Sequence, residues 1–208
     1  MAEDYNTELA RRTAQFTQYL ERMRQRARAE VKGNCFSVFD EEQTGVRSQP
    51  ARSVSRAKKL ALSPGTGGSM DARTYESDSW PEDGWRDDQD PGAKRFVQFG
   101  FLNKWFIMDL PRSTLTPDEA RRLIRDRTGF FYLKDRPAFA ASLTSECQVN
   151  LHDPFCKVYL YNEERNAAED MAYVFFSLWH FPVDWQFYFT AFSGGDPAVH
   201  FEDGIPLA

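Results

Sequence analysis

The sequence predicts an α+β fold, a two-layer sandwich in which two helices cover one face of a mainly antiparallel sheet. Short segments of alternating aromatic and aliphatic residues indicate strands, and segments with apolar residues three and four positions apart indicate helices. Of the 18 Phe, 8 Tyr and 5 Trp, 23 lie in residues 95–208. That region therefore has enough large apolar side chains to form a core.

Composition divides the chain into three predicted regions. They are an N-terminal amphipathic helix in residues 1–39, a charged linker rich in Gly, Ser and Pro in residues 40–94, and the α+β domain in residues 95–208. The linker has too few apolar residues to offset the entropy of ordering it, so we expect it to be disordered. Its charge is split: residues 46–70 carry five basic side chains and no acid, whereas residues 71–90 carry eight acids and two arginines.

The N-terminal helix is predicted over residues 6–32. Phe16, Leu20 and Met23 recur at steps of four and three, which is the spacing of one helix face. The apolar face is too short for a stable isolated coiled coil. We therefore expect it to pack on the chain's own C-terminal domain, on a second copy of the chain or on another protein, with Phe16, Leu20 and Met23 as candidate contacts.

In the C-terminal domain the expected element order is roughly ββαββαβ. Residues 95–109 contain two aromatic runs around Leu102-Asn103-Lys104, which predicts a β-hairpin. A helix follows, because Thr116 is a good N-cap, Pro117 suits the first helical position and Glu119 completes a capping box. These signals define the first half of the domain.

The second half of the domain is predicted to contain four strands and one helix. Strands are predicted at 130–133, 155–161, 184–192 and 199–201, and a helix at 163–179, while residues 138–145 match neither period clearly. The two helices of the domain are both amphipathic, so one layer of helices on one sheet face is the expected arrangement.

Several classes of protein are disfavoured by composition. The chain has no run of about 18 apolar residues, and its first residues lack a basic and then apolar leader, so we expect neither a membrane span nor Sec-type secretion. Three cysteines do not form a disulfide framework, which favours the cytoplasm. No glycine-rich phosphate loop follows a predicted strand, so no nucleotide or other cofactor is expected.

Catalysis and metal binding have one candidate cluster, formed by Cys147, His152 and Cys156. Thiolate and imidazole groups are zinc ligands, but a structural site needs a fourth ligand and these spacings are wide. A small hydrolase with a cysteine nucleophile and a histidine base is the enzymatic alternative. We predict no metal and assign no catalytic residue, because two small buried thiols beside a turn are the simpler explanation of the cluster.

Nucleic-acid binding is a second alternative. Arg121, Arg122 and Arg125 share one helix face and are able to contact phosphates. The domain nevertheless carries 11 basic and 15 acidic residues, which opposes binding to a polyanion. We therefore expect nucleic acid not to be the partner.

The features that remain favour binding to a protein. Trp80 and Trp85 stand five residues apart in an acidic stretch, and such aromatics can anchor a partner while the acids steer it. They can also fold back onto the domain. We expect a non-catalytic interaction protein whose acidic domain binds a protein partner. Its role is that of an adaptor, a chaperone-like protein or an inhibitor. The most concrete form of this hypothesis is an acidic inhibitor of a basic protein. Trp80, Trp85 and the helix face are its expected contacts.

Overall fold

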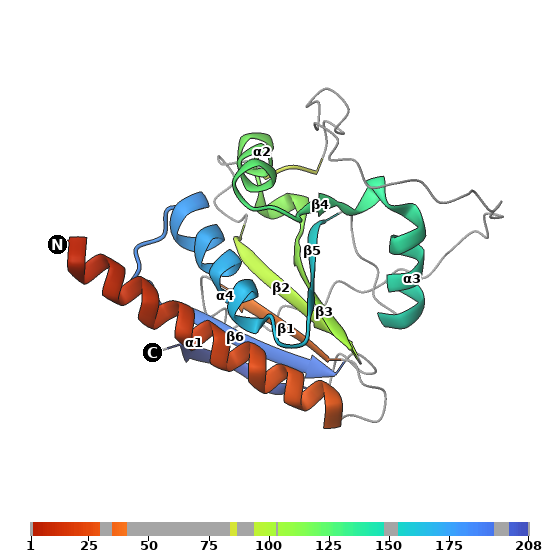
Figure 1. Ribbon diagram of the computed structural model, residues 1–208, viewed down its shortest axis with the longest axis horizontal. Helices are drawn as coiled ribbons and strands as arrows, with labels where there is room; N and C mark the ends of the chain where they lie inside the picture. Colours follow the sequence, from red (N-terminus) through yellow and green to blue (C-terminus); the bar gives the residue numbers. More distant parts are fainter. Residues whose placement is uncertain are drawn as a thin grey trace.

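The predicted α+β class is confirmed by the computed structural model. Its described residues form one seven-stranded sheet in the order β4-β5-β3-β2-β1-β6-β7, with every neighbouring pair antiparallel and helices packed against it (Figure 1). The structure describes residues 2–29, 35–40, 84–86, 94–102, 104–147, 154–193 and 200–207. Most of the predicted linker lies outside these ranges.

Most predicted elements are present with small shifts of their ends. The strands in the described ranges are β1 (Cys35–Asp40), β2 (Phe96–Phe101), β3 (Trp105–Leu110), β4 (Phe131–Tyr132), β5 (Phe155–Leu160), β6 (Phe187–Ser193) and β7 (His200–Leu207). The α-helices in these ranges are α1 (Ala2–Ala29), α2 (Pro117–Asp126), α3 (Pro137–Cys147) and α4 (Glu164–Ala172). The predicted hairpin is β2 and β3.

The start of α2 follows its predicted capping chemistry. The Glu119 backbone N–H donates to Thr116 Oγ1 at 3.2 Å, and the Thr116 N–H donates to Glu119 Oε2 at 2.8 Å. Pro117 is the first helical residue. Two of the N–H groups left free at a helix start are thus satisfied locally.

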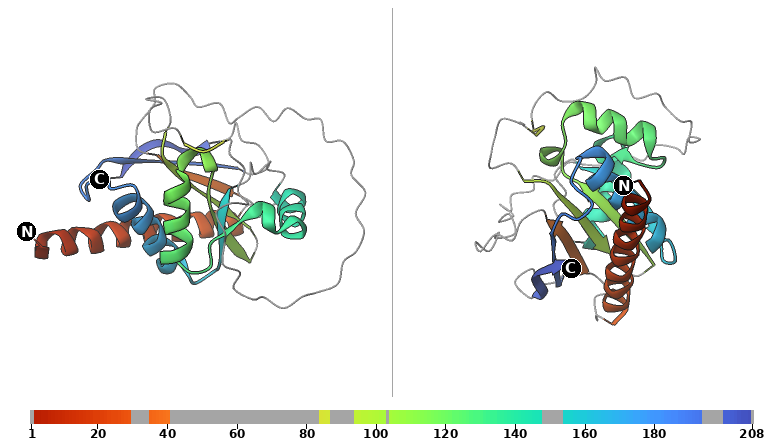
Figure 2. Two further views of the ribbon diagram at one scale, coloured as in Figure 1. Left: turned by 90° about the horizontal axis from the view of Figure 1, so that it is seen from above. Right: turned by 90° about the vertical axis from the view of Figure 1, so that its left-hand side faces the viewer.

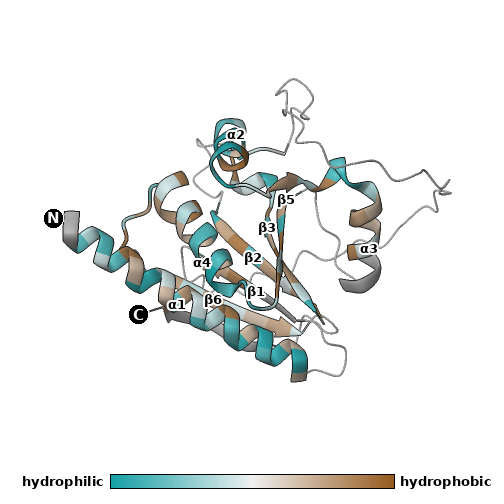
Figure 3. Ribbon diagram, in the orientation of Figure 1, coloured by the Kyte–Doolittle hydropathy of each residue, from teal (hydrophilic) through white to brown (hydrophobic). Residues whose placement is uncertain are grey.

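One face of the sheet is covered by α1 and α4, which lie side by side (Figures 1 and 2). Phe16 of α1 packs against Phe39 of β1 and Phe175 after α4, with ring centroids 6.0 and 6.2 Å apart. Leu123 of α2 joins the same core cluster. Hydrophilic and hydrophobic residues alternate along α1, as expected for a helix with one buried face (Figure 3).

Two segments differ from the predicted pattern. Residues 138–145, which matched neither period, belong to α3, whose Leu143 joins a second core cluster with Ile107 and Cys156. The helix predicted over 163–179 is α-helical in α4 and then continues as a π-helical segment, Tyr173–Leu178.

The N-terminal region belongs to the domain that was predicted to begin at residue 95. β1, which the sequence analysis did not identify, lies between β2 and β6 near the middle of the sheet. Its Phe39 and the α1 residues Phe16 and Leu20 are buried in the main core. Residues 2–29 and 35–40 are therefore structural parts of the sandwich.

Candidate functional site

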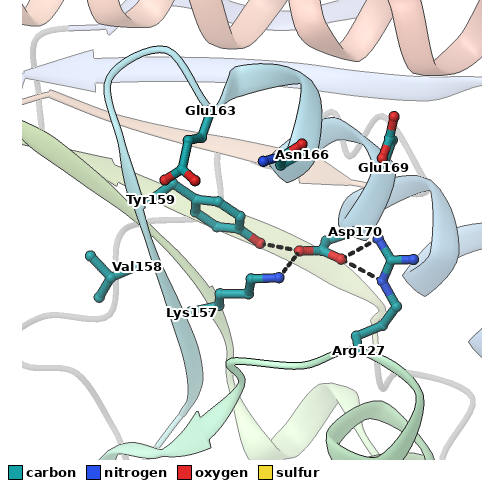
Figure 4. A pocket seen from close by; sticks show the side chains of 8 residues that line it. All are labelled: Arg127, Lys157, Val158, Tyr159, Glu163, Asn166, Glu169 and Asp170. Carbon is teal, nitrogen blue, oxygen red and sulfur yellow. Dashed lines mark hydrogen bonds and ion pairs between the residues drawn. The ribbon is translucent and has the colours of Figure 1, made fainter.

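A polar cleft opens between β5, the first turns of α4 and the C-terminal end of α2 (Figure 4). Its volume is about 220 Å³. The residues that line it are Arg127, Lys157, Val158, Tyr159, Glu163, Asn166, Glu169 and Asp170. The lining is mainly charged, in contrast to the aromatic core beside it.

The period of β5 places the polar side chains in this cleft. Successive strand residues point to opposite faces, so Lys157 and Tyr159 lie on the α4 side of the sheet, whereas Cys156 and Val158 lie on the other side. Asp170 reaches the cleft from the buried side of α4. Residues distant in sequence therefore meet because a strand and a helix pack together.

Asp170 is only 1% exposed, and three donors surround its carboxylate. Lys157 Nζ lies 2.6 Å from Oδ2, and the Tyr159 hydroxyl donates to the same oxygen at 2.7 Å. The Arg127 guanidinium forms an ion pair with Oδ1 (Figure 4). These contacts replace the water that the buried charge loses, so this network is a structural connection between α2, β5 and α4.

Tyr159 acts as a donor in this network. Burial, and then the neighbouring charge of Asp170, raises the pKa of Tyr159 well above the usual value of 10.0. The phenol therefore stays protonated at neutral pH, and it holds the Asp170 carboxylate instead of acting as a base.

The mouth of the cleft is formed by the turn between β5 and α4. Glu163 Oε2 accepts the Leu160 backbone N–H at 2.6 Å, and the Glu163 N–H donates to the Leu160 carbonyl at 3.0 Å. Glu169 is paired with the exposed Arg165 at 3.1 Å. Since both cations of the cleft contact Asp170, the mouth suits a cation or a hydrogen-bond donor better than an anion.

Two apolar side chains are exposed beside the cleft. Val158 is 36% exposed and Leu160 is 62% exposed. Both side chains project from the face of β5 opposite Lys157 and Tyr159, which follows from the strand period, and Val158 also borders the cleft at the strand edge. An apolar strip and a polar cleft thus share one strand.

The predicted contact face of the N-terminal helix is covered by the chain itself. Phe16 and Leu20 are fully buried and Met23 is 2% exposed, all within the main core. Of the three expected packing partners, the chain's own domain is the one observed. These side chains are therefore not accessible to a second copy or to another protein in this structure.

The two tryptophans have different outcomes. Trp80 lies outside the described residues. Trp85 is half-buried, with its ring centroid 5.9 Å from that of Phe155, and the Arg112 guanidinium lies 5.6 Å from the same ring. Trp85 is thus folded back onto the domain, and its ring is partly occupied by intramolecular contacts.

The candidate cysteine and histidine cluster is described only at Cys156. That thiol is buried, and desolvation followed by the charge of Asp109 raises the pKa of Cys156 well above 9.0. A buried thiol with a raised pKa is a poor nucleophile. His152 and the side chain of Cys147 lie outside the described residues, and among those described no group of three or more His, Cys, Asp or Glu is placed to hold a metal.

The arginines of α2 are engaged with neighbouring groups. Arg121 is paired with Asp118, Arg125 with Asp126 at 2.6 Å, and Arg122 donates to the Ser177 carbonyl at 3.2 Å. The hydrogen bond from Arg125, followed by one from a tyrosine, lowers the pKa of Asp126 to about 2. Acids accompany these cations, which weakens their attraction for phosphate.

Sequence reasoning did not bring the residues of the cleft together as one site. The alternation of β5 showed that Lys157 shares a strand face with aromatic residues, which is an unusual place for a lysine. A lysine at such a position needs a carboxylate partner, but the sequence pattern does not identify Asp170 as that partner. In the described part of the chain, no helix is long and apolar enough to cross a membrane.

Neither a protein-family model, nor a curated protein, nor a solved structure matches this chain.

Proposed function

We propose that this protein is a non-catalytic interaction protein whose acidic α+β domain binds a protein partner. The observation that carries the proposal is the apolar strip of Val158 and Leu160, exposed on a strand at the rim of a polar cleft. Adaptor, chaperone-like and inhibitor roles all share this activity.

The exposed strip supports binding because a strand near a sheet edge with apolar side chains is prone to pair with other chains. Other large apolar side chains of the described strands are buried or half-buried, whereas those of Val158 and Leu160 are exposed. Among the described strand residues, the strip is therefore where large apolar side chains face solvent. Neighbouring exposed apolar side chains on one strand face support a binding site there.

Charge supports a basic partner. Residues 95–208 carry 11 basic and 15 acidic side chains, and the whole chain has a formal net charge of −5. An acidic surface accelerates association with a basic protein and disfavours acidic ones. The low and odd number of cysteines agrees with a reducing compartment such as the cytoplasm.

Cysteine-dependent hydrolysis receives less support. Such an enzyme needs an accessible thiolate next to a base, whereas the Cys156 thiol is buried and its pKa is raised. The carboxylate of Asp170 is 1% exposed and is engaged by its three donors. The ionisable groups of the cleft interior thus stabilise the fold.

The experiment is capture from the native lysate with the full chain as bait, followed by light scattering of the purified complex. We expect a basic protein at a fixed stoichiometry, released as the salt concentration rises. A matched bait, Leu160→Asp, should lose the partner, whereas Tyr5→Asp, which changes an exposed apolar residue on α1, should retain it. Failure of the wild-type bait to retain any stoichiometric protein would overturn the proposal.

A further inference from the structure

The edge of β5 has an interruption at Val158. β4 pairs with Phe155 and Cys156 only, and the Leu133 N–H donates to the Pro154 carbonyl at 3.0 Å. Backbone groups of alternate residues point to opposite sides of a strand, so those of Pro154, Cys156 and Val158 point away from β3. The next step of the ladder would join Val158 to Gly129.

The ladder stops short of that step. Gly129 has a φ of 92°, in a region that favours glycine, and it lies against the Lys157 side chain, where an added Cβ would be 3.3 Å from Lys157 Cε; it is not paired with Val158. No described backbone group continues the ladder on the outer side of Val158. Among the described residues, its outward N–H and C=O groups are thus left as an open position in the sheet edge.

The other side of this position is closed by the turn into α4. Glu163 accepts the outward N–H of Leu160 and donates to the Leu160 carbonyl, so Leu160 has local partners. The open edge is therefore short, bounded by Gly129 at one end and by the Glu163 turn at the other. This gap has the length of a short extended segment, not of a long strand.

We propose that the β5 edge at Val158 binds a short extended segment of the partner protein in which apolar and basic side chains alternate. This inference rests on the proposed function and names its site. The Val158 N–H and C=O hydrogen-bond to the partner backbone. Alternate partner side chains then lie beside Val158 and Leu160 on one face and enter the polar cleft on the other.

The charge of the cleft favours the basic side chains of the alternating partner segment. Its lining has three carboxylates and two cations, and both cations contact Asp170. Glu169 is already paired with Arg165, so Glu163 supplies the main attraction at the mouth. The cleft has a volume of about 220 Å³, which leaves room for a lysine or arginine side chain.

The first test measures binding of a fluorescent peptide to the full chain by polarisation. The probe is Val-Lys-Val-Lys-Val-Lys-Val-Lys. One control peptide has the same composition as a block of valines followed by a block of lysines, and a second replaces every lysine by glutamate. We expect the alternating basic peptide to bind at least about tenfold more tightly than either control. Equal binding of the alternating and block peptides would overturn the proposal, because net charge alone would then explain it.

The second test changes the edge itself. Val158→Pro removes the outward N–H without removing a bond to β3, and proline is tolerated at such edge positions. We expect Val158→Pro to weaken peptide binding at least about tenfold. Val158→Thr keeps the N–H and should bind the peptide within about threefold of the wild-type affinity. Glu163→Gln keeps an oxygen for the Leu160 N–H and should weaken binding about three- to tenfold. Circular dichroism and thermal unfolding check that each variant folds.

The outcomes separate this inference from the proposed function. If Val158→Pro folds and still captures the native partner, the edge site is wrong although the protein binds a partner. If the wild-type chain binds neither the peptide nor any lysate protein, both proposals fail. The site would be supported if Val158→Pro, and not Val158→Thr, lost both the peptide and the native partner.

Discussion

The two faces of the sheet each bury an aspartate, and the two carboxylates have opposite surroundings. Asp170, at the α4–β5 cleft, is 1% exposed and is held by Arg127, Lys157 and Tyr159. Asp109, on the opposite face of β3, is 2% exposed, and no described hydrogen bond or ion pair reaches it. Burial raises the pKa of Asp109 from 3.8 to about 7.

This comparison shows that burial alone does not decide the charge of a carboxylate. Desolvation penalises both ions, but two cations and a hydroxyl compensate Asp170. The strand neighbours of Asp109 are Gln98 and Cys156, neither of which is a cation. A negative charge is therefore stabilised in one region and disfavoured in the other.

The largest expected effect follows from removing the charge of Asp170. Asp170→Asn leaves Arg127 and Lys157 facing each other without their shared anion, so the free energy of unfolding should fall by about 3–5 kcal/mol. Urea unfolding at neutral pH measures this. A loss below about 1 kcal/mol would mean that water already solvates the two cations and that the network does not stabilise the fold.

The second prediction concerns the pH dependence contributed by Asp109. Because its folded pKa is raised, this contribution to stability is fully present below pH 3.8 and is lost as the pH rises through about 7. The free energy of unfolding that Asp109 contributes below pH 3.8 and loses above about pH 7 is as much as about 4 kcal/mol.

Asp109→Asn isolates that contribution, since asparagine does not titrate. The difference in unfolding free energy between the variant and the wild-type chain should shift in favour of the variant between pH 4 and pH 8. Denaturant unfolding of both proteins over this range provides the measurement. A difference that stays constant with pH would show that Asp109 titrates normally.

The third prediction removes one donor from Asp170 and keeps both cations. Tyr159→Phe should lower the free energy of unfolding by about 1.5–3 kcal/mol, the usual contribution of a hydrogen bond to a charged group. Combining it with Asp170→Asn should cost less than the two single changes added together, because the residues are in direct contact. Simple additivity would argue against a shared network.

The smallest effect is expected at the rim of the cleft. Arg165 is 82% exposed in its ion pair with Glu169, so Arg165→Ala should change the free energy of unfolding by less than about 0.5 kcal/mol. The same denaturation assay tests it. A large loss would place the rim in the structural network together with Asp170.

Local chemistry in the sequence was sufficient to predict much of this fold. The capping box of α2, the β2–β3 hairpin, the alternation of β5 and the amphipathic face of α1 all depend on residues a few positions apart. Such patterns are visible without knowledge of the partners. They established the α+β class and the positions of most elements.

The candidate site was not predictable in the same way. The strand period placed Lys157 and Tyr159 on one face, but the choice of Asp170 as their partner depends on how α4 packs on β5. The opening at Val158 depends on where β4 leaves the sheet at Gly129. Both are consequences of contacts between elements that no local period specifies.

The sequence by itself determined most of the segments that are helical or extended and which of their faces are apolar, but not β1 or α3. Only the tertiary structure decided what covers those faces: α1 packs on its own sheet, Trp85 folds back beside Phe155, and β1 pairs with β2 and β6. The physical reason is that helix periods and caps come from neighbouring residues. Strand pairing and burial, in contrast, depend on residues far apart in the chain, whose contacts form only when the whole domain closes.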